Sequence, residues 1–399
     1  MAVYLNALGL NCALGQGKAA VAKALFAGDA SGMRAQGGWV AERALTVGAV
    51  PGELPALPAL PGHPASRNNQ LLLAAALEIE SEIRAAIAQF GAGRIGVILG
   101  TSTSGIEEAS QGIAQHQQHG ELPASYDYAQ QELTAPAAFL SDWLGLGGPS
   151  YVISTACTSG ARALLSAQRL INLGLCDAVL CGGVDSLCRL TLNGFSALEA
   201  VSAEPCQPFS ANRQGINIGE GAALFLMSKE ALPGSEPISL LGGGASCDAH
   251  HISAPQPDGL GAQAAMEKAL TAAGISAEQV DYLNLHGTAT LHNDAMESHA
   301  VQAIFPNGVP CSSSKAMVGH TLGAAGALEA AFCWLTLSPY NPEHCLPPHL
   351  WDGQADPALP TLNLVNTGTQ LSTKHPRRLM SNSFAFGGNN ISLLLGDAP

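Results

Sequence analysis

One cysteine has a setting suited to nucleophilic chemistry. Cys157 follows a strand-like run, residues 151–154, and precedes a segment whose apolar side chains have helical spacing. This order puts the thiol at a predicted helix N-terminus, where the macrodipole and free N–H groups favour a thiolate. A free thiol has a pKa of about 8.5, so this position is a means of activation. The alternative is a small buried thiol that packs beneath the helix.

Two histidines have comparable settings. His286 ends a predicted strand, and the hydroxyl residues Thr288 and Thr290 follow it. His320 precedes a predicted helix over residues 321–337, and a helix N-terminus disfavours the imidazolium form of its ring. Each histidine alone could be structural. Together with an activated cysteine, they indicate thiol chemistry with partners that polarise a carbonyl or transfer a proton.

Other candidates are weaker. Residues 215–221 are glycine-rich but lack the spacing of a dinucleotide-binding loop and a Walker lysine. Asp294 suits the start of a helix whatever its function. No histidines have a convincing metal-ligand spacing, so we expect neither a metal nor a cofactor. Residues 383–390 form either an ordinary connection between strands or a mobile backbone that donates an N–H to a developing oxyanion.

The elements that position these residues alternate between strand-like and helix-like segments. Strands are predicted at 94–100, 151–154, 178–181, 222–227, 238–241, 282–285 and 390–395, and helices at 71–90, 264–273 and 321–337. This alternation indicates α/β layers around mostly parallel sheets. We interpret 48–65 and 339–360 as surface connections and 105–135 as an irregular excursion. Two prolines and a glycine within 230–237 divide the chain into domains 1–237 and 238–399.

Composition excludes several classes of protein. The 399 residues hold 17 Lys+Arg and 31 Asp+Glu, a net charge of −14, which argues against nucleic acid as a partner. Charged residues make up 12% of the chain, about half of what is usual, so we expect a large core and extra surface buried against another subunit. The longest apolar run, 322–337, contains Glu329 and is too short to span a bilayer. Ten scattered cysteines without a C-x-x-C pair, and no signal-peptide pattern, indicate a cytoplasmic protein with reduced thiols and no membrane association.

Taken in order, the motifs resemble those of the β-ketoacyl-(acyl carrier protein) synthases, the elongating condensing enzymes of fatty acid and polyketide synthesis. The segments that carry the resemblance cover essentially the whole chain: Thr155–Gly160, Pro208–Gly215, Gly219–Ala222, Asp248–His251, His286–Asp294, Ser314–His320, Gly323–Gly326 and Asn382–Gly388. The resemblance implies an α/β thiolase-like fold, with two similar βαβαβαββ halves forming five α/β/α/β/α layers. It also implies a dimer, either a homodimer or a heterodimer with a homologous chain-length-factor-like subunit.

The resemblance also assigns roles. Cys157 would take the acyl group from a phosphopantetheine thioester on acyl carrier protein, and His286 and His320 would assist loss of CO₂ from the malonyl thioester and stabilise the enolate. The N–H groups of Cys157 and Phe386 would form the oxyanion hole. Supporting and substrate-binding roles fall to Lys315 paired with Glu329, to Asp294, to Thr288, Thr290 and Phe384 along the pantetheine tunnel, and to Thr103 at the far end of the acyl pocket.

Some positions depart from the family pattern. Residues 385–390 read Ala-Phe-Gly-Gly-Asn-Asn where Gly-Phe-Gly-Gly-Thr-Asn is usual, and the Cβ of Ala385 restricts the dihedral freedom of this loop. Gln207 stands where an arginine that meets the carrier protein is common, and Ser210 replaces a usual aspartate. The polar Thr103 hints at a non-standard acyl chain, so a polyketide or aryl-polyene-type pathway is credible beside fatty acid synthesis.

Two alternatives remain open. A non-catalytic chain-length-factor-like partner would have lost the nucleophile, whereas Cys157, His286, His320 and Lys315 are all present. Thiolases and CoA-primed starter enzymes typically carry a cysteine or an asparagine in place of the second histidine. The charge of −14 raises a separate question, because carrier proteins are themselves acidic. Docking must use a local basic patch, with Arg67 and Arg213 as candidates, or apolar contacts.

Overall fold

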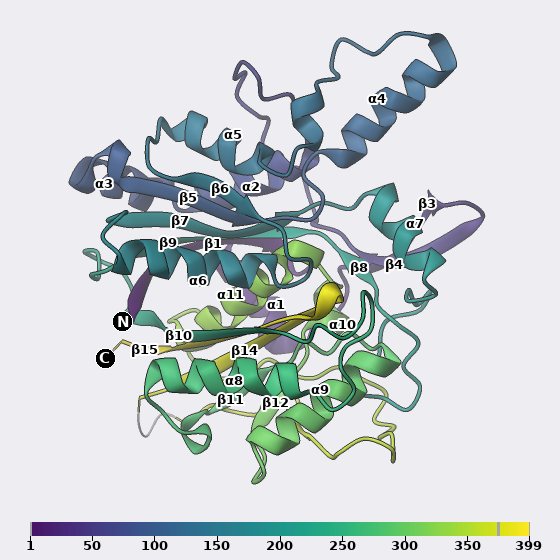
Figure 1. Ribbon diagram of the computed structural model, residues 1–399, viewed down its shortest axis with the longest axis vertical. Coiled ribbons are helices and arrows are strands. Elements are labelled where there is room, and N and C mark those ends of the chain that lie inside the picture. The colour runs from purple at the N-terminus through teal and green to yellow at the C-terminus, as the bar shows by residue number, and fades with distance from the viewer. Residues whose placement is uncertain (1, 373–375, 399) are drawn as a thin grey trace.

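The computed structural model describes residues 2–372 and 376–398 (Figure 1). Its helices are α1 Lys18–Ala27, α2 Arg67–Glu78, α3 Glu80–Phe90, α4 Ile106–His119, α5 Ala135–Leu144, α6 Ser159–Asn172, α7 Arg189–Ala197, α8 Leu260–Ala273, α9 Leu291–Ile304, α10 Lys315–Val318 and α11 Ala325–Leu337. Its strands are β1 Val3–Cys12, β2 Gly15–Gln16, β3 Met33–Val40, β4 Arg43–Gly48, β5 Ile95–Gly100, β6 Ser150–Ile153, β7 Ala178–Asp185, β8 Ile218–Gly219, β9 Gly221–Ser228, β10 Ile238–Cys247, β11 Tyr282–Asn284, β12 Pro310–Ser312, β13 Asn363–Leu364, β14 Arg378–Ala385 and β15 Asn389–Asp397.

The main sheet has the strand order β13-β12-β11-β14-β15-β10-β1-β9-β7-β5-β6. Its two halves meet where β1 pairs with β10 through Val3–Leu240 and Tyr4–Ser239. Each half combines parallel pairs, such as β5 with β7, and antiparallel pairs, such as β7 with β9. The prediction of mostly parallel sheets was therefore wrong in part, because a buried apolar strand has the same composition in either orientation.

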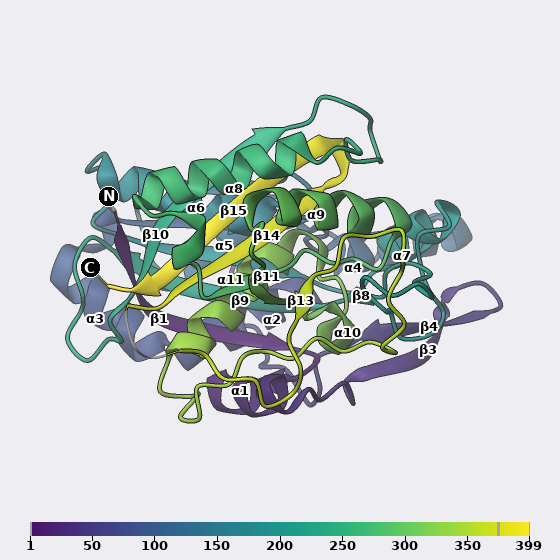
Figure 2. The same cartoon turned by 90° about the horizontal axis from the view of Figure 1, so that it is seen from below.

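Five layers follow one another through the molecule (Figure 1). Helices α2, α3 and α5 cover one half-sheet, α6 and α11 lie between the two halves, and α8 and α9 cover the other side, where they lie next to each other (Figure 2). Every residue of α11 is buried, as expected for a helix that is apolar except for Glu329 and Thr336 and is packed between sheets. The predicted thiolase-like α/β architecture is confirmed. The division at residue 237 stays a prediction; β10 begins at Ile238.

Three local predictions were wrong. The helix predicted over 71–90 is two helices, because Ile79 leaves the helical conformation with φ −122° and ψ 22° between α2 and α3. The excursion predicted over 105–135 contains α4, a polar helix that buries only Ala109 and Gly112 and so lacks an apolar stripe. The helix predicted from Thr321 begins at Ala325, after a 3₁₀ turn. No helix in the described part of the chain is long and apolar enough to cross a membrane.

Candidate active site

Cys157 lies between β6 and α6, one residue before the N-cap of that helix. Ala156 adopts a left-handed conformation, with φ 51°, which turns the chain sharply from strand to helix. Glycines then let α6 approach α11: a Cβ added at Gly160 would lie 2.9 Å from the backbone nitrogen of Ala327. The thiol is consequently held between the two half-sheets, and Cys157 is 8% exposed.

His320 comes from the segment between α10 and α11, and its backbone is fixed by a neighbouring loop. Its N–H donates to the carbonyl oxygen of Asn217 at 2.6 Å, and the N–H of Gly219 donates to the His320 carbonyl at 2.9 Å. A Cβ on Gly219 would lie 2.1 Å from the carbonyl oxygen of Val318. The glycine-rich run over 215–221 therefore serves close backbone packing around His320.

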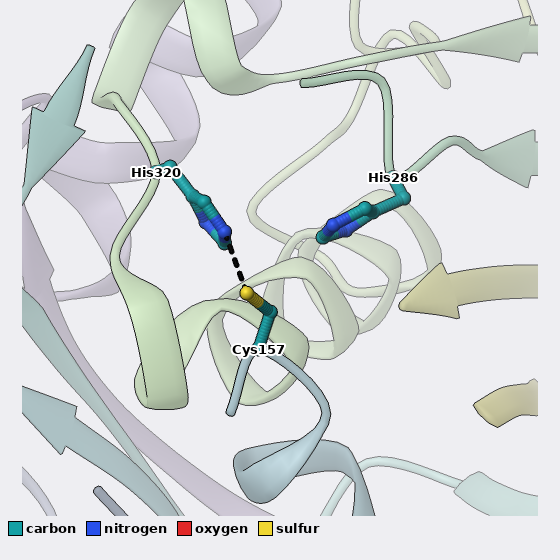
Figure 3. Close-up of side chains that lie close together, drawn as sticks. All are labelled: Cys157, His286 and His320. Atoms are coloured by element: carbon teal, nitrogen blue, oxygen red, sulfur yellow. Dashed lines mark hydrogen bonds between the residues drawn. The ribbon is translucent and has the colours of Figure 1, made fainter. Parts of the chain in front are cut away.

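The two rings and the thiol meet in one place (Figure 3). Nε2 of His320 lies 2.9 Å from Sγ of Cys157, and the ring of His286 lies 5.3 Å from that of His320, centroid to centroid, at an interplanar angle of 83°. The sulfur and one ring nitrogen of each histidine lie within 4.8 Å of one another. Cys157 and the two histidines, which lie 129 and 163 positions after it in the sequence, thus form a single group, as the sequence predicts.

A buried carboxylate holds the backbone at His286. The backbone N–H groups of His286 and Gly287 donate to the two carboxylate oxygens of Glu297, at 2.8 and 2.7 Å. Glu297 lies on α9 and is fully buried. Sequence reasoning did not select it, because the start of α9 could not be fixed from the sequence and an acidic residue near a helix start suits the dipole; Glu297 is in fact the seventh of the fourteen residues of α9.

Lys315 and Glu329 form a buried ion pair behind His286. The Lys315 ammonium donates to a carboxylate oxygen of Glu329 and to the carbonyl oxygen of His286, and it lies 3.4 Å from Nδ1 of His286. Both side chains are at most 3% exposed. Burial raises the pKa of Glu329 to about 6, while the Lys315 charge acts in the opposite direction.

Burial controls the protonation of the reactive groups. It raises the pKa of Cys157 to about 12, although the charge of Lys315 lowers it. Burial, followed by Lys315, holds the pKa of His286 and His320 well below the usual 6.5. The resting cysteine is therefore a thiol, contrary to the thiolate predicted from the helix N-terminus. His320 is neutral as predicted, but the first cause is burial. The thiol donates to Nε2 of His320.

These groups lie at the bottom of a cavity of about 360 Å³. The predicted residues that line it are Cys157, His286, Thr288, Thr290, His320, Phe384 and Phe386. Asp294 does not line it; its carboxylate accepts the N–H of Phe209 at 2.7 Å. Thr103 is also outside, because its hydroxyl donates to Asp185 at 2.7 Å. Its role at the far end of an acyl pocket stays a prediction.

A tight turn carries Phe386 at the cavity wall. Phe386 is 37% exposed, and its ring packs against Phe195 with the centroids 5.7 Å apart. Gly387 has φ 78°, a conformation that favours glycine, whereas Ala385 has φ −140° and ψ 156°, which any residue adopts. In this conformation the Cβ of Ala385 therefore causes no backbone strain.

Two further carboxylates shape the site and were missed from the sequence. Asp185 is fully buried and accepts hydrogen bonds from the loop after β5 and from the Ala324 N–H, at 3.0 Å. Asp248 accepts from the side chain of Asn390 at 2.6 Å, beside the Phe386 turn. Asp248 could have been selected from the sequence, because it belongs to the segment Asp248–His251 that carries part of the family resemblance. Asp185 has no local sequence pattern that marks it.

The two arginines considered for a basic patch are both engaged. Arg67 binds both carboxylate oxygens of the buried Glu220, at 2.7 and 2.5 Å. The side chain of Arg213 is 4% exposed and is paired with Asp356 at 2.7 Å. Arg213 therefore presents no free cation, whereas the Arg67 side chain, although paired, is 39% exposed, and a docking patch at these residues stays a prediction.

Comparisons with known proteins agree with this geometry. The model for the β-ketoacyl synthase N-terminal domain matches residues 63–231, and that for the C-terminal domain matches 239–349. The chain is 46% identical, with a TM-score of 0.93, to a structure described as a ketosynthase (ApeO) in complex with its chain length factor (ApeC) from Xenorhabdus doucetiae; the alignment covers 100% of this chain and 98% of that one. The ishigamide ketosynthase/chain length factor is 27% identical, with a TM-score of 0.89, at 100% and 99% coverage.

A curated relative, 3-oxoacyl-[acyl-carrier-protein] synthase 2 of Rhizobium meliloti, is 37% identical over 63% of this chain. The chloroplastic 3-oxoacyl-[acyl-carrier-protein] synthase I of Hordeum vulgare is 33% identical over 75% of it. The chain spans 61% and 66% of the lengths of these two relatives.

Proposed function

Because the chain belongs to the β-ketoacyl synthase family, we propose that it catalyses decarboxylative condensation of an acyl group on Cys157 with a malonyl thioester on acyl carrier protein. The observation that carries the proposal is the group formed by Cys157, His286 and His320 at the bottom of one cavity, with Sγ 2.9 Å from Nε2 of His320. Carbon–carbon bond formation at an acyl carbonyl needs a nucleophile that is also a good leaving group, and a thiolate is both.

Acyl transfer comes first. The thiol proton moves to Nε2 of His320 as Sγ of Cys157 attacks the thioester carbonyl, and the same proton then reaches the departing carrier thiolate. The products are acyl-Cys157 and a free carrier thiol. The low basicity of His320 suits it to transfer this proton from one sulfur to the other. Burial lowers the pKa of its ring, so a proton bound at Nε2 is released readily.

Condensation follows in the same cavity. The malonyl C–C bond breaks to release CO₂. Once Cys157 is acylated, Nε2 of His320 no longer accepts from a thiol and the neutral ring can carry its proton on Nε2, so the enolate oxygen accepts hydrogen bonds from the rings of His286 and His320. The enolate carbon attacks the acyl carbonyl, the Cys157 thiolate leaves and takes up one proton, and the carrier keeps the β-ketoacyl chain. The N–H groups of Cys157 and Phe386 hold the carbonyl oxygen of the acyl group during both steps.

Substrate delivery needs a carrier protein, and the cavity mouth favours apolar docking. Four apolar side chains at or beside residues that line the cavity are exposed: Leu198 (58%), Ile252 (80%), Leu291 (61%) and Phe386 (37%). The net charge of −14 opposes long-range attraction of an acidic carrier, so contact between apolar surfaces is the mode that this mouth offers.

We also propose a dimer with a homologous chain-length-factor-like subunit and a substrate of the polyene type. Strand β6 ends the main sheet and leaves one edge unpaired within the described chain, which is a template for pairing with another subunit. The ApeO structure, 46% identical to this chain, contains a chain length factor. A non-catalytic role for this chain is disfavoured, because its nucleophile and both histidines are in place.

The decisive experiment follows the acyl group. Purified protein, alone and with a partner subunit, is incubated with acyl- and malonyl-carrier protein, and CO₂ release and the acyl group on Cys157 are measured, the latter by mass spectrometry. Cys157→Ala should abolish condensation, whereas Cys345→Ala, which removes a thiol that does not line the cavity, should not. A wild-type protein that is neither acylated nor able to decarboxylate malonyl thioester, even with the partner, would show that the proposal is wrong.

A further inference from the structure

Helix α6 carries a cationic residue that the proposed chemistry does not use. Arg162 lies five positions after Cys157 and is half-buried. Its Nη2 donates to the carbonyl oxygen of Ser246 at 3.3 Å, to Oδ1 of Asn389 at 3.3 Å and to the carbonyl oxygen of Asn390 at 3.5 Å. Its Nε is buried and has no hydrogen-bond partner among the described residues. Burial also lowers the pKa of Arg162, so placing the guanidinium here has a cost.

The three acceptors share one location. Ser246 is near the end of β10, Asn389 and Asn390 begin β15, and the two strands pair through Ser246–Asn390. Asn389 directly follows the turn that carries Phe386. A single side chain therefore connects the helix of the nucleophile to the residues that fix the end of the Phe386 turn.

The other hydrogen bonds of the turn lead elsewhere. The N–H of Gly387 donates to the carbonyl oxygen of Ile252 at 2.8 Å, and the N–H of Asp248 donates to the carbonyl oxygen of Gly388 at 2.8 Å. Both bonds join the turn to the loop after β10. Neither bond involves a residue of α6. Arg162 supplies the connection to α6.

We propose that Arg162 is a positioning residue that acts through Asn389 to set the spacing between the two oxyanion donors, the Cys157 N–H at the start of α6 and the Phe386 N–H on the turn. This inference rests on the proposed function of the site. Asn389 stands where the family pattern has a threonine, and its longer side chain reaches the guanidinium. The bonds, at 3.3–3.5 Å, are longer than the usual 2.9–3.0 Å, so the turn is held but can still move to admit an acyl chain.

Loss of the Arg162 connection should change kcat and leave KM as it is. The oxyanion donors act on charge that develops in the transition state, so loss of their spacing lowers kcat and leaves KM unchanged. We expect Arg162→Gln to lower kcat of condensation by about three- to tenfold, and Arg162→Lys to recover part of it, because an ammonium can still reach one acceptor. Arg169→Gln is the matched control: it removes the same charge from an exposed position on the same helix.

Asn389→Ala tests the same link from the other side and leaves Arg162 in place. Its kcat should fall comparably, and the double variant should lose no more than either single variant, because both remove one connection. Three results would each overturn the inference: the same kcat for Arg162→Gln and Arg169→Gln, a raised KM at unchanged kcat in Arg162→Gln, or additive losses of kcat in the double variant. If Arg162→Gln does not fold, the kcat of Asn389→Ala alone decides. A wild-type protein without acylation of Cys157 would instead contradict the proposed function.

Discussion

Removing the carboxylate beneath His286 should cost both stability and decarboxylation. Glu297→Ala leaves the buried N–H groups of His286 and Gly287 without their acceptors. Each unsatisfied buried group costs about 1–3 kcal/mol, so we expect a loss of about 4 kcal/mol in the free energy of unfolding. With an unfolding entropy of roughly 2.1 cal/mol/K per residue, this loss lowers Tm by about 5 °C in a chain of this length. Glu267→Gln, at an exposed helical position, is the control.

The Glu297→Ala variant should affect malonyl decarboxylation and acylation of Cys157 to different extents. His286 stabilises the enolate in the proposed mechanism but does not contact Sγ in acyl transfer, so Glu297→Ala should slow malonyl decarboxylation about tenfold or more and acylation of Cys157 much less. Burial raises the pKa of Glu297 to about 7 from 4.5. The native state therefore binds a proton that the unfolded state lacks, and wild-type stability falls as pH rises from about 4.5 to about 7. The stability gap to the variant should narrow over this range. An unchanged Tm, or equal slowing of both steps, would refute the reasoning.

Four other outcomes follow from the site and its charge. Because burial raises the pKa of Cys157 to about 12, its alkylation by iodoacetamide should keep rising with pH beyond 9; a plateau near 8.5 would contradict this. Added Zn²⁺ should inhibit and should protect Cys157 from alkylation, because the sulfur and two ring nitrogens lie within 4.8 Å, while a chelator alone should leave activity unchanged; alkylation unaffected by Zn²⁺ would exclude binding at these atoms. Ala385→Gly should change acyl transfer by less than about twofold, since the backbone is unstrained; a selective gain for long chains would instead show that the Cβ stiffens the turn. Carrier affinity should tighten as ionic strength rises, whereas weakening would indicate a basic patch.

The nucleophile and its histidines could be predicted because their signals are local. Cys157, His286 and His320 each stand at a junction between predicted elements, and such junctions in an α/β fold lie at one end of a sheet. The protonation of Cys157 could not be predicted in this way, because the thiol pKa depends on burial by segments far away in the sequence.

The supporting carboxylates and some elements escaped prediction for a common reason. Glu297 accepts from backbone N–H groups 10 and 11 positions away, and Asp185 accepts from one that is 139 positions away. A backbone donor has no residue type that the sequence could reveal. Helix α4 escaped because its exposed surface needs no apolar periodicity. Strand β14 was not predicted, because its polar residues, such as Asn382, are buried by pairing with β15 on one side and with the distant β11 on the other.

The acidic excess of the sequence has a different meaning once the positions of the carboxylates are known. Asp185, Asp294, Glu297 and Glu329 are buried around the site, and burial raises the pKa of each, to about 6 for Asp294 and Glu329 and about 7 for Glu297. Three of them accept hydrogen bonds from backbone N–H groups, and Glu329 accepts one from Lys315. A charge that is buried and partly protonated contributes little field outside the protein. The formal charge of −14 therefore overstates the repulsion that an acidic carrier meets at the surface, and the same carboxylates that make the chain acidic hold the histidines and the lysine in place.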